Sequence, residues 1–160
     1  LHIYWLLFYK INKLTTQKTS SDVSMEMDTI QAAVLLAKLP YFSKELLSRQ
    51  KVAERYTNGL SDILQTPVIK LNRSSAWGQY TLRVKNRDAL RLKLKNYGIP
   101  TFIFYPVSLH LQECFKYLRH KQGDFLISEK ASEEVLSIPM NPFLTHDQID
   151  HINLKIKENL

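Results

Sequence analysis

The sequence lacks most of the residues and short motifs that announce a specific chemistry. Its 160 residues include a single cysteine, Cys114, which excludes an internal disulfide and a cysteine-based zinc site and indicates a reducing, cytoplasmic compartment. Four glycines and six prolines are too few for a disordered or linker-rich chain. The sequence contains no GxGxxG, Walker, GxSxG or HExxH motif, so it offers no phosphate-binding loop, nucleophilic serine turn or zinc-protease helix.

Long hydrophobic runs are missing as well. The first eleven residues, LHIYWLLFYKI, are mostly apolar, but they are fewer than the about 20 residues that a membrane-spanning helix needs. They also lack the basic start and the small-residue cleavage site of a secretory signal. We therefore expect neither a transmembrane helix nor a signal peptide, and no membrane partner.

The five histidines do not form a metal-ligand pattern. His110 and His120 are ten residues apart across a predicted helix. His146 and His151 are five residues apart, which places them on different faces of a helix. Neither pair has the spacing of a zinc-binding motif, so we expect no metal site.

Positive charge exceeds negative charge by seven, with 22 Lys and Arg residues against 15 Asp and Glu. The basic residues are spread along the chain, and the densest group, from Arg83 to Lys95, lies mostly on one predicted helix and its approach. A solvated surface explains this distribution better than a nucleic-acid partner, which we do not expect. A further interpretation is that the charge helps to attract a phosphorylated small molecule.

Caps, stops and hydrophobic periodicity predict an α+β fold with a short antiparallel or mixed sheet and flanking helices. Capping-box patterns at Asp28 and Thr145 begin the first and the last helix. Pro40 ends the first helix, Ser43 caps the second, and Gly98 closes a third as its C′ residue. The predicted helices begin at 28, 43, 86, 111, 128 and 145, and the predicted strands cover 67–71, 77–84, 99–105 and 136–140.

The stretch GIPTFIFYPVSLHLQ at 98–112 is the best candidate for a binding site. Its apolar part predicts a buried strand that ends at Pro106, because proline cannot donate to a strand ladder. Tyr105, His110 and Gln112 would then lie on a loop at the end of that strand, which is where binding residues tend to lie.

A second aromatic and polar cluster, WGQY at 77–80, lies at the start of a predicted strand. Trp77 and Tyr80 have two interpretations: core packing, which we favour, and ligand contact. No activated nucleophile or phosphate loop accompanies either cluster, so together they resemble half of an active site.

Several segments of the chain occur in the same order in one protein family. They are MDTIQAAVLLAKL (27–39), RQKVAERY (49–56), SAWGQYTLRV (75–84), GIPTFIFYPVSLHLQ (98–112) and VLSIPMNPFLTHDQID (135–150). Together they resemble the C-terminal part of the pyridoxal-phosphate-dependent sugar-nucleotide aminotransferases of the DegT/DnrJ/StrS group. Within that group, the chain looks most like the enzymes that aminate UDP-2-acetamido-2-deoxy-3-oxo-glucuronate for surface polysaccharide.

The resemblance implies a connecting helix followed by the small C-terminal domain of the type I aminotransferase fold, at 27–160, without the large cofactor domain. Residues 1–26 resemble nothing expected in that place and are interpreted as an atypical N-terminal segment or linker. In the family, the lysine that forms a Schiff base with pyridoxal phosphate lies in the large domain, upstream of these segments. We therefore expect a truncated aminotransferase that is inactive alone and does not bind the cofactor by itself.

The resemblance also suggests substrate-binding residues. The family usually has His-Tyr or Tyr-Tyr before the proline that ends the strand, and this chain has Phe104 and Tyr105 there. Tyr105 keeps one expected hydrogen bond to the substrate, and Phe104 cannot make the other. His110 and Tyr80 complete the set of residues predicted to contact a sugar nucleotide.

Two positions just before the first matching segment depart from the family. Ser24 replaces an asparagine that reaches the cofactor phosphate of the neighbouring subunit, and Glu26 replaces an arginine near the substrate. The partners implied are a nucleotide sugar, an amino donor, a second subunit of a homodimer and a large domain encoded separately. The alternative function is a non-catalytic module that binds a nucleotide sugar or a protein.

Overall fold

The computed structural model describes residues 28–160, so the predictions for Ser24, Glu26 and the boundary at 26/27 lie outside the described residues. The described residues up to Ala37 belong to one unit, and Lys38–Leu160 form another. Helix α2 (Thr29–Lys38) begins as predicted, because the Asp28 carboxylate accepts a hydrogen bond from the Gln31 backbone N–H at 2.8 Å. It is followed by the short 3-10 helix η1 (Leu39–Tyr41), which contains Pro40.

Helix α3 (Phe42–Leu60) is the longest helix in the described part of the chain. The predicted cap at Ser43 is wrong: the N-cap residue is Tyr41, and no side chain caps this end. The second half of α3 contributes a buried face to the core, and that face has the helical spacing seen in the sequence. Its members are Val52, Ala53, Tyr56 and Leu60.

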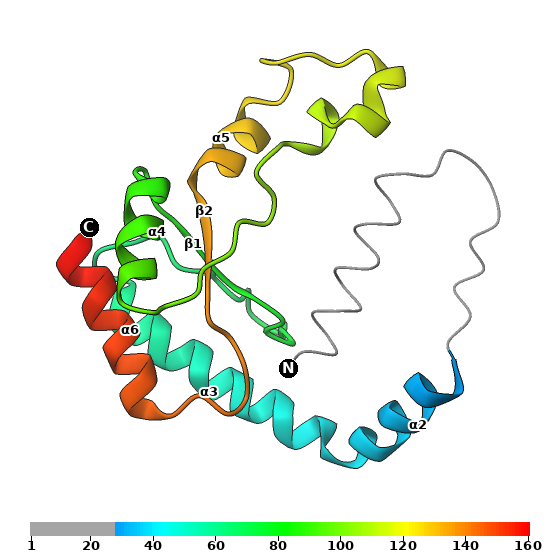
Figure 1. The fold of residues 1–160 in the computed structure, drawn as a ribbon, viewed down its shortest axis with the longest axis vertical. Coiled ribbons are helices and arrows are strands. Elements are labelled where there is room, and N and C mark those ends of the chain that lie inside the picture. Colours follow the sequence, from blue (N-terminus) through cyan, green and yellow to red (C-terminus); the bar gives the residue numbers. More distant parts are fainter. Residues whose placement is uncertain (1–27) are drawn as a thin grey trace. The chain divides into compact units, whose positions relative to one another are not determined.

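The sheet has two antiparallel strands, β1 (Tyr80–Arg83) and β2 (Val135–Ile138) (Figure 1). Their register pairs Tyr80 with Ile138 and Leu82 with Leu136. Tyr80 and Leu82 are buried, while the residues that follow each of them are only partly buried, so the predicted alternation of β1 is confirmed. Both strands are shorter than the predicted segments 77–84 and 136–140.

Two predicted strands are wrong. The segment 67–71 contains no strand, and its apolar side chains point outward, with Val68 84% and Leu71 90% exposed. The segment 99–105 contributes a single bridge, in which Phe102 and Ser137 exchange backbone hydrogen bonds of 2.9 and 2.8 Å. Both segments have the apolar, β-branched composition that is typical of strands. Neither of them pairs with a neighbouring strand over more than one residue pair, so neither extends the sheet.

The remaining helices lie close to their predicted positions. Helix α4 (Arg87–Asn96) is followed by Gly98 at a φ of 72°, a left-handed conformation that favours glycine. Helix α5 (Leu126–Glu134) precedes β2, and helix α6 (His146–Asn159) begins with the predicted capping box between Thr145 and Gln148. The helix predicted at 111–118 is instead two 3-10 helices, η2 (Leu109–Leu111) and η3 (Glu113–Leu118).

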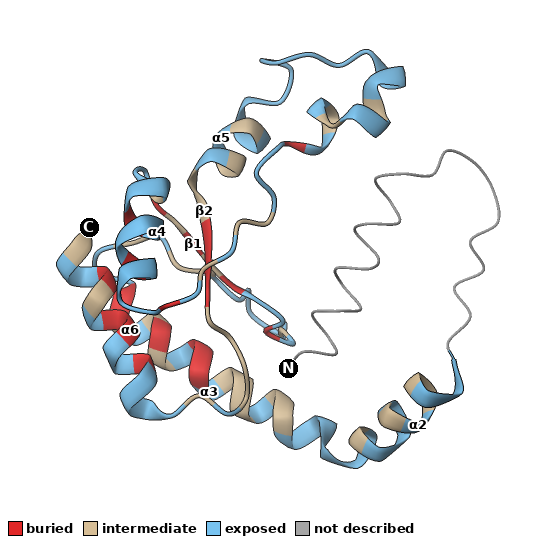
Figure 2. Cartoon of the chain, in the orientation of Figure 1, coloured by how far each residue is buried: buried red, intermediate tan, exposed pale blue. Residues whose placement is uncertain are grey.

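The core of Lys38–Leu160 lies between the sheet and helices α3, α4 and α6, and α6 packs against both α3 and α4 (Figure 1). Buried residues are concentrated on the second half of α3, on both strands and on one face of α6 (Figure 2). The α+β class predicted from the sequence is confirmed. Among residues 28–160, no helix has the length and apolar character to cross a bilayer.

Candidate functional site

The loop from Ile99 to Gln112 is anchored at its start to the sheet. Ile99 is buried, and Phe102 is held by its two backbone hydrogen bonds to Ser137 of β2. Ser137 in turn shares a hydrogen bond of 2.8 Å with the hydroxyl of Thr81 on β1. The first part of the loop therefore follows the sheet even though it is not a regular strand.

A second anchor holds the loop after the proline. Ser108 is buried, and its hydroxyl donates to the hydroxyl of Ser132 on α5 at 3.3 Å. The His110 ring lies 3.0 Å from a Glu129 carboxylate oxygen, and its side chain is only 8% exposed. The Gln112 amide donates to the Val107 carbonyl at 3.3 Å and closes the turn.

Tyr105 lies between these two anchors and faces solvent. It is 47% exposed, and the neighbouring Pro106 and Val107 are exposed as well. Its ring contacts Phe104 edge to face at a centroid distance of 5.8 Å, and Phe104 stacks on Phe102 at 5.9 Å. The peptide bond between Phe104 and Tyr105 is cis. The arrangement presents a phenol hydroxyl and aromatic surface to solvent from a loop that is fixed on both sides.

His110 belongs to a different cluster from Tyr105. Its ring contacts Phe125 at 4.8 Å, and Phe125 also contacts His120 at 5.0 Å. Glu129 accepts hydrogen bonds from the backbone N–H groups of Gly123 and Phe125 in addition to His110. The carboxylate therefore ties the segment around 123–125 to η2, and His110 positions the loop rather than facing solvent beside Tyr105.

The charge state of Glu129 agrees with this role. Burial raises the pKa of its carboxyl, but the two backbone N–H groups and the His110 ring together outweigh burial, so the pKa lies below its usual value. The ionised carboxylate is thus the form that the folded segment prefers. Within residues 28–160, no group of three or more His, Cys, Asp or Glu side chains could hold a metal ion.

Tyr80 is not a surface binding residue, which corrects one of the predicted substrate contacts. Its side chain is fully buried, its hydroxyl lies 2.7 Å from that of Thr57, and its ring contacts those of Tyr56 and Trp77. Burial raises the pKa of the Tyr80 phenol, with the Thr57 hydroxyl opposing this effect. Trp77 is buried in the same core cluster as Tyr80, so the core-packing interpretation of both aromatic residues is confirmed.

The described residues do not by themselves fit a covalent pyridoxal-phosphate site. Such a site needs a lysine amine that is desolvated enough to react at neutral pH. None of the lysines at 28–160 is buried, and the loop at 99–112 contains no lysine. What this part of the chain offers is the exposed Tyr105 and its aromatic neighbours.

Basic residues that we interpreted as solvated surface also line a cavity at another place in the fold. Arg83, Lys85 and Lys93 come from the basic group noted in the sequence, and Lys130 joins them from α5. In the sequence, only the cluster of basic residues between Arg83 and Lys95 could have indicated this cavity. That Lys130 lies beside this cluster depends on the tertiary structure. Neither Phe104, Tyr105 nor His110 lines this cavity.

Comparison with known proteins places this chain among aminotransferases. Residues 8–157 match the DegT/DnrJ/EryC1/StrS aminotransferase family, and this match begins upstream of Met27, within the segment where we expected no resemblance. The UDP-2-acetamido-2-deoxy-3-oxo-D-glucuronate aminotransferase of Pseudomonas aeruginosa is 38% identical over 123 residues. That alignment covers 76% of this chain and 33% of the relative.

Solved structures agree with the sequence match. A DegT DnrJ EryC1 StrS aminotransferase from Brucella abortus superposes with a TM-score of 0.79 at 36% identity, covering 89% of this chain and 40% of the other. NtdA from Bacillus subtilis, solved with its bound cofactor PMP, has a TM-score of 0.71 at 25% identity, covering 83% and 32%. The chain thus spans about a third to two-fifths of the length of these proteins. It belongs to the DegT/DnrJ/EryC1/StrS aminotransferase family.

Proposed function

We propose that residues 28–160 form the small-domain part of a pyridoxal-phosphate-dependent aminotransferase that acts on a nucleotide sugar, and that Tyr105 binds the sugar. The observation that carries this proposal is the exposed Tyr105, held between the Phe102 and His110 anchors in one of the segments that resemble the family. A phenol hydroxyl can donate to or accept from a sugar hydroxyl. Phe104 adds apolar surface against which a sugar face can pack.

The proposed substrate class rests on the name of the Pseudomonas aeruginosa relative. Its name specifies a UDP-linked 3-oxo uronate, and it shares 38% identity with this chain. We propose a 3-oxo sugar nucleotide of this type as the amino acceptor. His110 serves as a positioning residue, since its Nε2 is hydrogen-bonded to Glu129 and its side chain is only 8% exposed.

The rest of the active site would come from a large domain, either in a longer form of this protein or in a second chain. The absence of any buried lysine from residues 28–160 supports this division, and so do the many apolar side chains exposed before the core. Exposed apolar surface of that extent marks a protein interface more often than free surface. Within the unit Lys38–Leu160, these residues are Leu39, Tyr41, Phe42 and Leu47.

A chimera tests the proposal directly. Residues 28–160 would replace the corresponding segment of the Pseudomonas aeruginosa relative, and transamination of its 3-oxo substrate would be measured. We expect an active enzyme in which Tyr105→Phe lowers kcat/KM about tenfold, because a hydrogen bond to the sugar is lost. Tyr117→Phe, a change at another exposed tyrosine, is the matched control and should be neutral. An active chimera that is indifferent to Tyr105→Phe would contradict the assignment of Tyr105.

The 160-residue chain alone should not catalyse transamination when pyridoxal phosphate, an amino donor and the 3-oxo sugar nucleotide are supplied. Turnover by the isolated chain would contradict the need for a large domain. Titration of the isolated chain with a UDP-sugar tests the remaining alternative, which is a non-catalytic binding module. Tight binding that Tyr105→Phe abolishes, together with an inactive chimera, would favour a non-catalytic binding module.

A further inference from the structure

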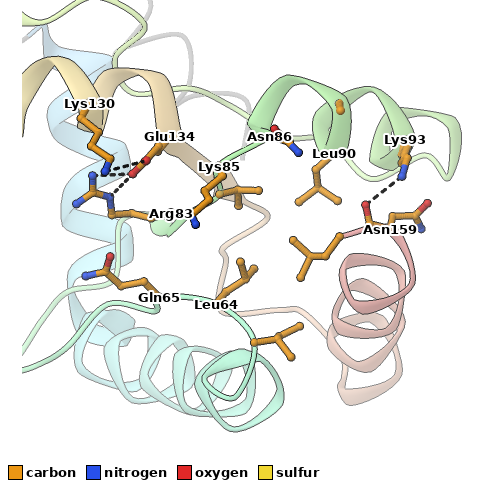
Figure 3. Close-up of a pocket in the computed structure, with 14 residues that line it drawn as sticks. Leu64, Gln65, Arg83, Lys85, Asn86, Leu90, Lys93, Lys130, Glu134 and Asn159 are labelled. Carbon is orange, nitrogen blue, oxygen red and sulfur yellow. Dashed lines mark hydrogen bonds and ion pairs between the residues drawn. The ribbon is translucent and has the colours of Figure 1, made fainter.

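A cavity of about 630 Å³ lies at the end of the sheet where β1 leads into α4 (Figure 3). Its volume falls within the range of about 300–1,000 Å³ that is typical of small-molecule sites. Five segments of the chain surround it: the turn after α3, the end of β1, the start of α4, the end of α5 and the end of α6. All of them belong to the unit Lys38–Leu160.

The charged residues that line the cavity are unequal in sign. Four are cationic and one is acidic, a net charge of +3; they are Arg83, Lys85, Lys93, Lys130 and Glu134. Figure 3 shows Arg83 and Lys130 converging on Glu134, with nitrogen to oxygen distances of 2.7 and 3.9 Å. Since Arg83 neutralises Glu134, the charges of the three lysines remain available to a ligand.

Two of these lysines flank the cavity from opposite ends of α4. The Lys93 ammonium donates to the Asn159 carbonyl at 3.2 Å, which holds it at the wall formed by α6 (Figure 3). Lys85 precedes the helix and has no acidic partner within the part of the chain that the structure describes. The ammonium of Lys85 is exposed, so it is open to an anion that enters the cavity.

The start of α4 adds backbone donors. The N-cap residue Asn86 makes no side-chain capping bond, so the first N–H groups of this ten-residue helix are not occupied by it. Asn86 and Ala89 both line the cavity, which places the positive end of the helix dipole at its wall. The lysines and the helix start thus favour the same kind of ligand.

We propose that this cavity binds a small molecule that carries a diphosphate group. A single phosphate ester carries about −1.5 to −2 charges at neutral pH, so a net +3 from side chains matches two linked phosphates better than one. The floor is apolar, formed by Leu64, Val84 and Leu90, and can hold a non-phosphate part of the ligand. The concave shape favours a small molecule over an extended nucleic acid.

Calorimetric titration of the whole chain with inorganic pyrophosphate and with ADP tests the proposal at low ionic strength. We expect saturable binding of both, tighter for ADP if the diphosphate belongs to a nucleotide whose base uses the apolar floor. Lys85→Gln and Lys93→Gln should each weaken binding about tenfold, as expected for loss of one charge-assisted contact. Lys44→Gln, an exposed lysine near the other end of α3, is the charge-matched control and should bind like the parent.

Amide chemical shifts locate the ligand independently of the variants. Pyrophosphate should perturb the backbone N–H signals of Asn86 and Ala89 and leave the loop at Tyr105 unchanged. Three results would overturn the proposal: no saturable binding, equal weakening by Lys44→Gln, or perturbation confined to the Tyr105 loop. A single-stranded oligonucleotide that binds through Lys85 and Lys93 while pyrophosphate does not would also overturn it, in favour of nucleic acid. Far-UV circular dichroism of each variant confirms that the fold is retained.

Discussion

Gly59 of α3 lies in close contact with Asn153 of α6, and adding one methyl group there should destabilise the fold. A Cβ atom at position 59 would lie 2.8 Å from the Cγ of Asn153 and still closer to its amide nitrogen. Carbon atoms in contact ordinarily lie about 3.5–4.0 Å apart, so the two helices must separate or Asn153 must leave its rotamer. Overpacking of this kind costs about 1–3 kcal/mol.

Two further contributions to the free energy of unfolding decide whether Gly59→Ala destabilises or stabilises the protein. Alanine is favoured over glycine within a helix by about 1 kcal/mol, which offsets part of the clash. Asn153 itself contributes little, because its side-chain oxygen is buried without a hydrogen-bond partner and its nitrogen donates to the Arg55 carbonyl at a long 3.4 Å. Gly59→Ala should therefore destabilise the parent by about 1 kcal/mol but stabilise an Asn153→Ala background by a similar amount.

Urea unfolding of the four proteins of this double-mutant cycle, followed by circular dichroism, measures the coupling. Gly78→Ala is the matched control, because a Cβ at Gly78 would meet no atom within 4 Å. The two substitutions should couple by about 1–3 kcal/mol. If Gly59→Ala has the same effect with and without Asn153, the close contact is not what makes glycine necessary, and the reasoning fails.

Two more predictions concern caps and pH. Thr145→Ala removes the capping box of α6 and should cost about 1 kcal/mol in thermal or urea unfolding, whereas Ser43→Ala, at a cap that the sequence predicted but the fold lacks, should be neutral. Glu129 has a folded-state pKa below its unfolded value, so its stabilising contribution is present at neutral pH and is lost as pH falls through the folded pKa. The stability difference between the parent and Glu129→Gln should shrink between pH 7 and pH 3.

Local signals in the sequence predicted the helices well. The side chain of Asp28 caps α2, the pair Thr145 and Gln148 forms a capping box, and Gly98 has the left-handed conformation expected after α4. Each of these features depends only on residues within four positions of one another. A short stretch of sequence therefore suffices to predict it, without knowledge of the tertiary structure. Ser43 is not a cap because the N-cap residue of α3 is Tyr41, two residues earlier, and Ser43 lies inside the helix.

Strands were harder to predict because a strand exists only when it is paired. The segments 67–71 and 99–105 have the composition of strands, yet within residues 28–160 the sheet consists of β1 and β2, with isolated bridges at Gln65 and Phe102. Composition indicates that a segment fits a pleated surface but does not indicate which neighbour would accept its hydrogen bonds. The first segment remains exposed, and the second leaves the sheet after one pair.

Contacts between residues far apart in the sequence also place the predicted site residues in different parts of the fold. The sequence placed Tyr105 and His110 together because they are five residues apart, but His110 is held by Glu129, which is nineteen residues further along the chain. Tyr80 is buried in the core, where its hydroxyl forms a hydrogen bond with Thr57 of α3. Tyr105 is exposed on the loop, as its local sequence predicted, although the strand expected before it is reduced to one bridge.

The basic residues show how one pattern can satisfy two interpretations. Lys85 and Lys93 are exposed, as the solvated-surface interpretation requires. The fold adds Lys130 from α5 and an apolar floor at Leu64, so that the same charges surround a concave space. Charges that converge on a cavity repel one another, and an anion that relieves this repulsion is bound more strongly than it would be by any single lysine. We therefore expect Lys85→Gln and Lys93→Gln to weaken anion binding more than Lys44→Gln does, although all three lysines are exposed.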